Sequence, residues 1–489
     1  MNRHGVRGET TSSGAPVGAR AAGLLAVVGF ACGVLVVLVG GRIDSVPLAI
    51  PLTNWVGVLS TSGVPPGNAV PGALMLAGIA GLVGLWVVAN VVFRSAVHAE
   101  RQVWWIAGAW SLPFVVGPPM LSNDVWTYAA QGLMVRDGLD PYSSGPSALG
   151  NIPVVEAVDP YWRSVPSPYG PLATTVQHLA VAISGGNPIG AVIVFRGLGV
   201  ACLIAIGVLA ADIAGRRRVQ ALVLTVLNPL LLLHVVSGAH LDGVMCALLL
   251  GALACAQRER WVLAVVLACA AGSVKAPAFI AVLAVIAVHA HHARGGRAWR
   301  VAAGYAAVAV ISVAGFTVVV SHGSGWVRAL NTPSLGHTVL APASLVADLL
   351  HPIVSGASSD DLATGGRVSM LLAALCVVVY LTATANWRSL ADTVGYGLLA
   401  VALLSPVVYP WYLLWAVVCF APTPTDSHRD WVLALSASAS LFDPPGFSRP
   451  TSIRLSILAV AVCVALLAPR ALRRHRELPP PPVATPWGH

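Results

Sequence analysis

The chain has 489 residues, of which 57% are hydrophobic and 10% charged, with a net charge of +9 and a mean hydropathy of +0.79. Soluble domains carry about 25% charged residues, so this composition argues against a soluble globular protein, a disordered chain and a nucleic-acid-binding protein. Such a chain is counted in membrane spans of about 20 residues rather than in soluble domains.

About fourteen apolar segments follow one another along the chain and predict an all-α polytopic membrane protein with about 13–14 transmembrane helices. They lie at 20–40, 70–93, 103–119, 192–214, 219–237, 243–257, 261–274, 276–290, 301–320, 368–385, 389–408, 409–421, 431–443 and 453–469. Several are short, which indicates broken helices. The first is longer than the apolar run of a signal peptide and lacks a clear cleavage site, so we expect it to remain as a span.

The basic residues set the orientation of these spans, because cytoplasmic loops carry an excess of Lys and Arg. With the N-terminus in the cytoplasm, 19 of the 28 basic residues fall on the cytoplasmic side. The external face then carries two long loops, at about 120–191 and 321–367, and loops of this length are usually functional. We expect one transmembrane domain at 20–469 between cytoplasmic tails at 1–19 and 470–489.

Two apolar stretches in the first external loop do not fit this count as spans. Residues 125–136 read as a short interfacial helix. Residues 172–186 look apolar enough to cross, but a crossing would move Arg216–Arg218 to the outside. We therefore expect both stretches to lie on or dip into the outer face of the membrane.

Two kinds of site are not predicted. The eight cysteines all lie within apolar runs and none has CxxC spacing, so we interpret them as small core residues rather than a disulfide framework. We name no converging set of ligands and predict no metal site. The sequence has no P-loop, so an ATP-driven pump is not predicted either.

The first polar cluster is Ser122-Asn123-Asp124, directly after the third span. The structural interpretation is that Asn123 or Asp124 caps the helix at 125–136. The functional interpretation is a carboxylate at the outer membrane boundary that takes part in chemistry. The two roles are compatible.

The same loop continues with Asp140 and Tyr142 and ends with Tyr169, in segments whose Gly and Pro residues fix turns. Aromatic rings at this depth often form an interfacial belt. They also suit a sugar-binding surface, because a pyranose packs its C–H face against an aromatic ring. Both interpretations stay open.

Two more clusters follow at outer ends of spans. His240 and Asp242 stand two residues apart beside a glycine, and a lone histidine is more often structural than catalytic. Lys275, the only lysine beside 27 arginines, is expected at the outer tip of a tight helical hairpin. It either snorkels to the interface or holds a lipid-linked phosphate, and in the second case we expect Lys275→Met to leave folding largely intact.

A fourth group places Tyr409 and Trp411 on the outer face as well. Arg196 is expected just below the outer surface, at the start of the fourth span, and Arg367 near the start of the tenth. Both could balance the charge of a phosphate.

Several of these segments together resemble the GT-C-fold glycosyltransferases that use polyprenyl-phosphate sugars. The chain is most similar to the polyprenol-phosphomannose-dependent α-1,6-mannopyranosyltransferases that build the mannan core of lipomannan and lipoarabinomannan. The resemblance covers roughly 70–420 and rests on SNDVWTYAAQG (122–132), GLDPYSSGP (138–146), PSPYGP (166–171), HLDG (240–243) and VKAP (274–277).

The resemblance implies an inverting transfer of mannose from polyprenyl-phosphate mannose to a mannose 6-hydroxyl of a lipid-anchored mannan, on the outer face of the plasma membrane. It implies that Asp124 is the catalytic base. We expect no cofactor, and a metal stays open. We expect contacts to the donor phosphate from Lys275, Arg196 and Arg367. We expect substrate contacts from Asn123, Tyr128, Asp140, Tyr142, Tyr169, His240, Asp242, Tyr409 and Trp411.

Two alternatives remain. One is a GT-C transferase of another polyprenyl-phosphate sugar, such as arabinofuranose. The other is a lipid or glycan transporter. Transporters usually place polar groups near the bilayer midplane and repeat their fold in two halves, and the sequence shows neither feature.

Overall fold

The computed structural model describes most of the chain. The described residues are 18–43, 54–55, 59–60, 69–293, 297–319, 324–330, 341–351, 358–385, 388–423, 425–442, 451, 453–463 and 465. The expected tail at 470–489 lies outside the described residues. So do residues 1–17 of the expected N-terminal tail and much of the expected loop at 321–367.

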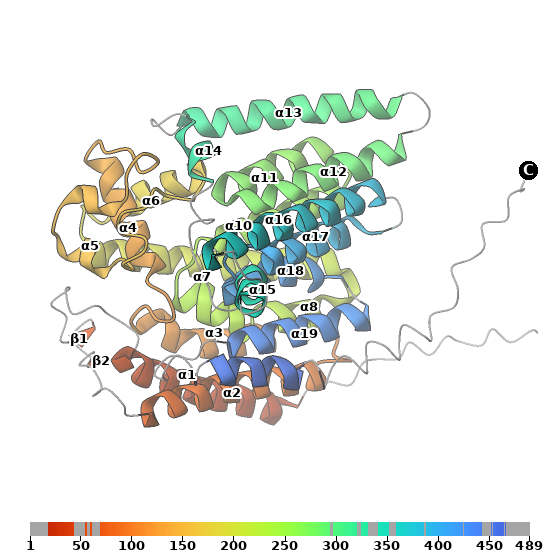
Figure 1. Cartoon of the computed structure of the whole chain (residues 1–489). Coiled ribbons are helices and arrows are strands. Elements are labelled where there is room, and N and C mark those ends of the chain that lie inside the picture. The colour runs from red at the N-terminus through yellow and green to blue at the C-terminus, as the bar shows by residue number, and fades with distance from the viewer. Residues whose placement is uncertain are drawn as a thin grey trace, which may run out of the picture.

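The described chain is a bundle of helices (Figure 1), with one two-residue antiparallel pair of strands, β1 (Asn54–Trp55) and β2 (Leu59–Ser60). Five helices are long and apolar enough to cross a membrane: Ala19–Ile43, Val70–Val92, Pro188–Thr225, Ala298–Val318 and Asp361–Ala383. Other apolar helices have 10–17 residues. The predicted all-α polytopic membrane architecture is confirmed, and the number of crossings stays a prediction.

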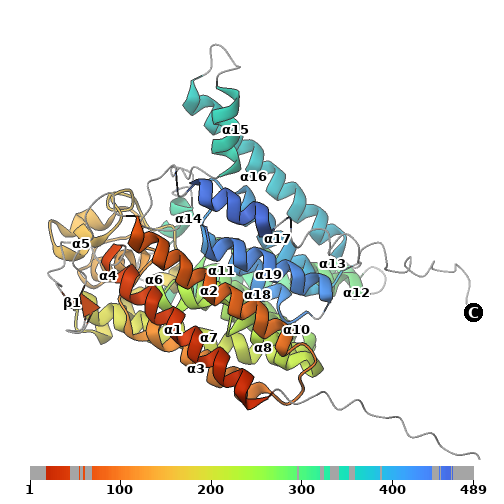
Figure 2. The same cartoon turned by 90° about the horizontal axis from the view of Figure 1, so that it is seen from below.

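The helices of the bundle follow the predicted spans closely. The longer ones are α1 (Ala19–Ile43), α2 (Val70–Val92), α3 (Glu100–Val116), α7 (Pro188–Ala214), α13 (Ala298–Val319) and α16 (Ser359–Ala383). The shorter ones are α8 (Arg218–Thr225), α9 (Pro229–Leu231), α10 (Asp242–Gln257), α11 (Trp261–Val274), α12 (Phe279–His292), α17 (Leu390–Leu404), α18 (Leu414–Phe420) and α19 (Asp426–Ser440). In Figure 2, α16 runs along one edge of the bundle beside α15 (Pro342–Leu350).

The two ends of this bundle differ in composition. One end, called the site end here, carries the segment between α3 and α7, and Figure 1 shows α4 (Asp124–Arg136), α5 (Pro153–Ala157) and α6 (Pro171–Ile183) gathered there. From this end α7 runs for 27 residues, about 40 Å, to the other. That other end, called the basic end, holds the turns that link α2 to α3, α7 to α8, α10 to α11 and α18 to α19.

The turns at the basic end are joined by contacts between residues that we expect on the cytoplasmic side. Arg94 pairs with Asp426, Arg258 with Asp212, and Arg218 with Glu100. The arginines that fix the predicted orientation therefore gather at the end opposite to α4. Which end faces the cytoplasm stays a prediction.

Both stretches that we expect at the outer face form helices at the site end. Gly132 of α4 lies against the backbone of Gln177 in α6 so closely that a Cβ atom would overlap the Gln177 carbonyl. Most side chains of α4 are buried by protein, which an isolated interfacial helix would not show. With 13 residues, α6 is about 20 Å long, shorter than the ~30 Å hydrocarbon core.

The predicted span at 219–237 is a broken helix. It consists of α8, then α9, which begins after Asn228, and a six-residue π-helical segment, Leu232–Ser237. Asn228 accepts a hydrogen bond from Leu230 N and donates one to Ser436 Oγ at 2.8 Å, which ties the break to α19. Single π-helical turns are rare and occur frequently at functional sites. This one leads directly to His240.

Candidate active site

Asp124 opens α4 at the point where the chain leaves α3. Its backbone N–H donates to Ser122 Oγ at 3.1 Å, so Ser122 satisfies the free donor at this helix start. Asn123 occupies the cap position but makes no side-chain cap hydrogen bond. The interpretation of Asn123 or Asp124 as the capping side chain is therefore wrong, and the Asp124 carboxylate is available for other contacts.

Two tyrosines hold one oxygen of this carboxylate. The hydroxyl of Tyr128, one turn along α4, donates to Asp124 Oδ2 at 3.3 Å, and that of Tyr169 donates to the same atom at 3.2 Å. The two hydroxyls lie 3.0 Å apart. Burial raises the pKa of both phenols, and the charge of Asp124 adds to this, so they stay protonated donors. The other oxygen, Oδ1, has no tyrosine partner.

His240 approaches the same carboxylate from the turn between the π-helical segment and α10. Its Nδ1 lies 3.3 Å from Asp124 Oδ2, and its side chain is buried. Ala239 before it adopts a left-handed backbone, φ +52°, which an alanine rarely does. A strained backbone of this kind persists only where the surrounding structure holds it in place. Such residues cluster at functional sites.

Two opposing effects set the pKa of Asp124. Burial favours the neutral acid, whereas the nearby imidazole of His240, with a smaller contribution from the charge of Lys275, favours the carboxylate. The second group of effects prevails, and the pKa lies below its usual range. Asp124 is therefore ionised at neutral pH.

Asp242, a second carboxylate at the site end, has different partners. Lys275 Nζ lies 2.9 Å from its Oδ1 and 3.1 Å from its Oδ2. Trp415 of α18 donates its indole N–H to Oδ1 at 2.6 Å. Asp242 is 0% exposed, so it has no contact with solvent and depends on these protein partners. The lysine lies at the tip of the α11–α12 hairpin, as predicted, but its charge is already paired.

The PSPYGP segment (166–171) packs against the α11–α12 hairpin and places Tyr169 beside Lys275. Gly170 N donates to Val274 O at 3.1 Å, and a Cβ atom on Gly170 would overlap the carbonyl of Ser273, so only glycine allows this approach. Lys275 Nζ then lies 5.4 Å from the ring centre of Tyr169 and 4.6 Å from that of Tyr412. The segments that carry the family resemblance thus pack directly against one another.

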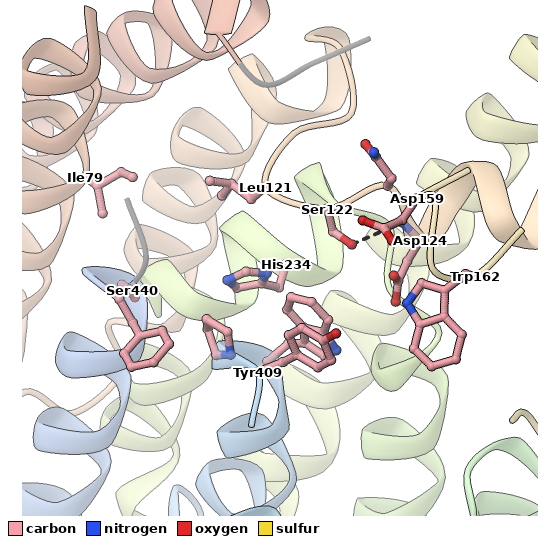
Figure 3. Close-up of a pocket in the computed structure, with 13 residues that line it drawn as sticks. Ile79, Leu121, Ser122, Asp124, Asp159, Trp162, His234, Tyr409 and Ser440 are labelled. Carbon is pink, nitrogen blue, oxygen red and sulfur yellow. Dashed lines mark hydrogen bonds between the residues drawn. The ribbon is translucent and has the colours of Figure 1, made fainter. Parts of the chain in front are cut away.

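Two cavities meet at Asp124. The smaller, polar one has a volume of about 190 Å³ and is lined by Ile79, Leu121, Ser122, Asn123, Asp124, Asp159, Trp162, His234, Tyr409, Pro410, Trp411, Ser440 and Phe442 (Figure 3). The larger, apolar one, about 370 Å³, includes Lys275, Pro277, Leu330, Leu371, Val401 and Tyr412 in its wall. Asp124, Trp162, Tyr409 and Trp411 line both.

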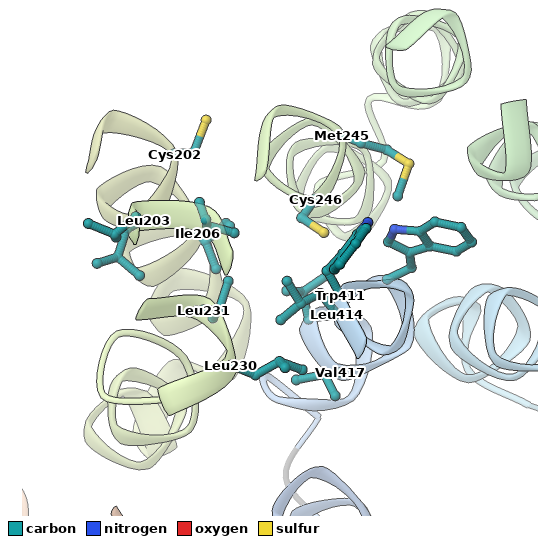
Figure 4. Close-up of a cluster of buried hydrophobic side chains, with 14 of the residues drawn as sticks. Cys202, Leu203, Ile206, Leu230, Leu231, Met245, Cys246, Trp411, Leu414 and Val417 are labelled. Atoms are coloured by element: carbon teal, nitrogen blue, oxygen red, sulfur yellow. The ribbon is translucent and has the colours of Figure 1, made fainter. Parts of the chain in front are cut away.

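The rings shared by the two cavities rest on the core of the bundle. Trp411 stacks on Tyr409 at 4.6 Å and on His240 at 4.1 Å between ring centres. Figure 4 shows Trp411 beside buried side chains of α10 and α18, among them Cys246 and Leu414. The packing of Trp411 against these core side chains fixes the Trp411 and Tyr409 rings relative to Asp124.

Seven expected site residues do not line these cavities. Tyr128, His240 and Asp242 reach the site through the contacts described above, and the other four are Asp140, Tyr142, Arg196 and Arg367. Asp140 closes a turn by accepting from Tyr142 N at 2.9 Å, and the Tyr142 hydroxyl lies 2.7 Å from Thr174 Oγ1. Arg196 is buried and donates to the carbonyls of Phe114, Val115, Gly117 and Ser237. Arg367 lies near Tyr161, where its charge partly offsets the rise that burial causes in the phenol pKa.

Sequence reasoning did not single out several residues that line the site. Asp159 and His234 line the polar cavity, and Trp415 holds Asp242. The aromatic run after Tyr409 was a signal for Trp415. Nothing in the sequence distinguishes His234 from a core histidine. Within the described part of the chain, no three His, Cys, Asp or Glu side chains are grouped so that they could hold a metal ion.

Two family models match the chain. One, described as "Alpha-(1->6)-mannopyranosyltransferase, N-terminal domain", matches residues 26–291, more than half of the sequence. The chain belongs to this family. The second, described as "MptB C-terminal domain", matches residues 343–474. The family resemblance predicted from the sequence is confirmed.

Curated relatives carry the same description. Alpha-(1->6)-mannopyranosyltransferase A of Mycobacterium tuberculosis is 30% identical, over 64% of this chain and 63% of its own length. A probable alpha-(1->6)-mannopyranosyltransferase of Mycolicibacterium smegmatis is 28% identical, over 77% and 76%. Alpha-(1->6)-mannopyranosyltransferase B of Corynebacterium glutamicum is 28% identical, over 72% and 64%. The chain thus spans less than two thirds of the first and third. No solved structure matches.

Proposed function

We propose that this membrane protein transfers mannose from polyprenyl-phosphate mannose to the 6-hydroxyl of a mannose in a lipid-anchored mannan, with inversion and formation of an α-1,6 bond. Membership of the family supports mannosyl transfer. The observation that carries the proposal is the position of Asp124, an ionised carboxylate where a large apolar cavity and a small polar cavity meet.

The two cavities suit two different substrates. The apolar cavity has Leu330, Leu371 and Val401 in its wall, which match a prenyl chain, and the ammonium of Lys275 beside them, which matches a phosphate. The polar cavity presents Asn123 and Asp159, together with the Trp411 ring, which match the hydroxyls and C–H face of a sugar. We therefore assign the donor to the apolar cavity and the acceptor to the polar one.

The chemistry requires one base. As the acceptor oxygen forms its bond to the mannose C1, its proton passes to Asp124, and the C1–O bond to the phosphate breaks with its electron pair on the leaving polyprenyl phosphate. Tyr128 and Tyr169 fix Oδ2, which leaves Oδ1 to take the proton. A phosphate leaving group needs no acid, but it needs positive charge nearby as negative charge develops.

Lys275 supplies that charge in this proposal. Two of the three N–H groups of its ammonium suffice for the contacts with Asp242, and the third remains for a phosphate oxygen in the apolar cavity. Arg367 is a secondary contact, near Tyr161 at the side of Trp162. Nη1 and Nη2 of Arg196 donate to backbone carbonyls at the end of α3 and at Ser237, so we assign this residue to positioning the end of α3 rather than to the phosphate.

The proposed location is the external face of the plasma membrane. The basis is the gathering of the basic residues at the opposite end of the bundle, since cytoplasmic loops are enriched in them. Both termini are then cytoplasmic. A cysteine introduced at Ser144, in the external loop, should react with an impermeant thiol reagent in intact cells whose wall has been made permeable, whereas one at Arg297 should not. The reverse pattern would overturn the proposed sidedness.

The test of the function is a transfer assay with the purified full chain in detergent, polyprenyl-phosphate mannose and a short α-1,6-linked dimannoside. We expect a trimannoside whose new bond is cleaved by an α-1,6-specific mannosidase. Asp137→Asn, at the exposed residue directly after α4, serves as a matched control for Asp124→Asn. Transfer from polyprenyl-phosphate arabinofuranose instead of the mannose donor would overturn the assignment of the sugar.

A further inference from the structure

A third cavity lies at the basic end, away from the proposed transfer site. Its volume is about 270 Å³, and it lies between the turns that link α2 to α3, α7 to α8 and α18 to α19. Its charged lining consists of Arg94, Arg217 and Arg429, with Asp426 as the one acid. We call it the basic pocket.

The arginines of the basic pocket have N–H groups that no acceptor within the described residues takes up. Among the described residues, Arg217 has no ion-pair or hydrogen-bond partner, and it is exposed. Arg429 contacts Asp426 at 3.6 Å and Asp430 at 3.3 Å, yet its Nε is buried and has no hydrogen-bond partner in the described part of the chain. Three guanidinium groups against two carboxylates, Asp426 in the lining and Asp430 behind Arg429, leave a surplus of positive charge and of N–H donors, which suits an oxyanion.

The walls of the pocket are held in place by the protein itself. Gln220 at the start of α8 donates from Nε2 to the carbonyl of Arg94 at 2.8 Å, and this bond joins the first two turns. Arg94 joins the α18–α19 turn through Asp426 at 3.4 Å. Thr423 and Thr425 add hydroxyl groups to the lining. The site is therefore built from three segments rather than from loose surface arginines.

The surface beside the pocket is apolar and faces away from the protein. Val91 and Val88 precede Arg94 by three and six residues on α2, and their side chains are 71% and 49% exposed. In a membrane protein such a face meets acyl chains. A lipid lying along α2 would therefore bring its headgroup to Arg94 and the pocket.

We propose that the basic pocket binds the phosphate group of an anionic phospholipid, with the acyl chains along α2. Basic pockets between membrane helices are a recognised way of holding such headgroups. The proposal is independent of the transfer reaction. Arg217 is the position whose substitution tests lipid binding best. Removing an unpaired contact should weaken binding without breaking an internal ion pair.

The experiment uses the full chain in detergent micelles and follows the unfolding midpoint as dioctanoyl phosphatidylglycerol is added. We expect a saturable rise, weaker at high salt, that dioctanoyl phosphatidylcholine does not produce. Arg217→Ala should weaken the apparent affinity about tenfold or more, as expected for a lost charge-assisted contact. Arg216→Ala is the matched control, since Arg216 is an exposed neighbour outside the pocket, and it should stay near the parent.

A second variant tests the charge balance. Asp426→Asn removes the acid that competes for Arg94 and Arg429, so binding should tighten a few-fold. Equal losses in Arg216→Ala and Arg217→Ala would overturn the site, as would equal stabilisation by the choline lipid. A full rise with sodium phosphate alone, at the same concentration, would overturn the lipid as the ligand.

Discussion

Asp124 and Asp242 stand in the first turns of α4 and α10 at the same end of the bundle, yet their surroundings differ. The Asp124 side chain is 21% exposed, touches both cavities, and has tyrosine hydroxyls and an imidazole as partners. Asp242 is 0% exposed, and its two oxygens are taken by an ammonium and an indole N–H. Of these two carboxylates, Asp124 alone lines the cavities.

The comparison indicates how the fold divides the work between two identical side chains. A buried carboxylate needs a paired cation, and a pair of this kind ties segments together rather than exchanging protons with a substrate. The Asp242–Lys275 pair joins α10 to the α11–α12 hairpin, against which Gly170 and Tyr169 pack. We infer that the second carboxylate positions the tyrosine that fixes the first.

The largest expected effect comes from breaking the buried pair. Lys275→Met leaves Asp242 buried without a cation, which costs about 3–5 kcal/mol and should lower the unfolding midpoint strongly. This corrects the expectation from sequence that the variant folds like the parent. Lys275→Met combined with Asp242→Asn should recover most of the stability, because no charge is then left unpaired.

The double variant also separates the two roles of Lys275. Once folding is restored, the concentration of polyprenyl-phosphate mannose needed for half-maximal transfer should still be raised, because the phosphate contact is missing. Equal unfolding midpoints for the single and double variants would show that Asp242 does not depend on Lys275.

A smaller effect is expected at Trp415. Trp415→Phe removes the indole N–H that donates to Asp242, and hydrogen bonds to charged groups contribute about 1.5–3 kcal/mol. Trp411→Phe is the matched control, since the Trp411 Nε1 is buried and has no hydrogen-bond partner among the described residues. Unfolding midpoints measured in the same detergent should fall for the first variant and change less for the second. A larger fall for Trp411→Phe would contradict the role given to the indole of Trp415.

The smallest effect concerns the acid side of the pH–rate profile. Burial alone raises the pKa of Asp124, and His240 is the main cause that lowers it. In the parent the lowered pKa keeps Asp124 ionised to a lower pH than an ordinary aspartate, so protonation of the base slows transfer only at that lower pH. His240→Asn should move this acid limb of kcat/KM to higher pH. An unchanged limb, or one moved to lower pH, would show that His240 does not tune the carboxylate.

Sequence patterns predicted much of this site. The apolar runs gave the helical membrane architecture, and the turn residues around Asp124, Tyr169 and His240 marked segments that do converge. Such patterns place residues at helix ends because hydrophobic length and loop punctuation are local properties.

The remaining features depend on tertiary contacts. Asp242 and Lys275 lie 33 positions apart, and nothing local shows that they neutralise each other. Arg196 is expected at the donor phosphate and Tyr142 at the substrate, and only the structure shows that backbone carbonyls and Thr174 are their partners within the protein. The π-helical turn before His240 has no signal in the sequence that we could use.

The division of roles is tested most directly by measuring transfer per folded molecule for Asp124→Asn. The unfolding midpoint should stay near that of the parent and of Asp137→Asn, because the tyrosine hydroxyls can still donate to the asparagine carbonyl. The transfer rate with both substrates at saturation should fall by about 10²-fold or more, the scale of general-base loss. A folded Asp124→Asn protein that transfers mannose at the parent rate would contradict the account.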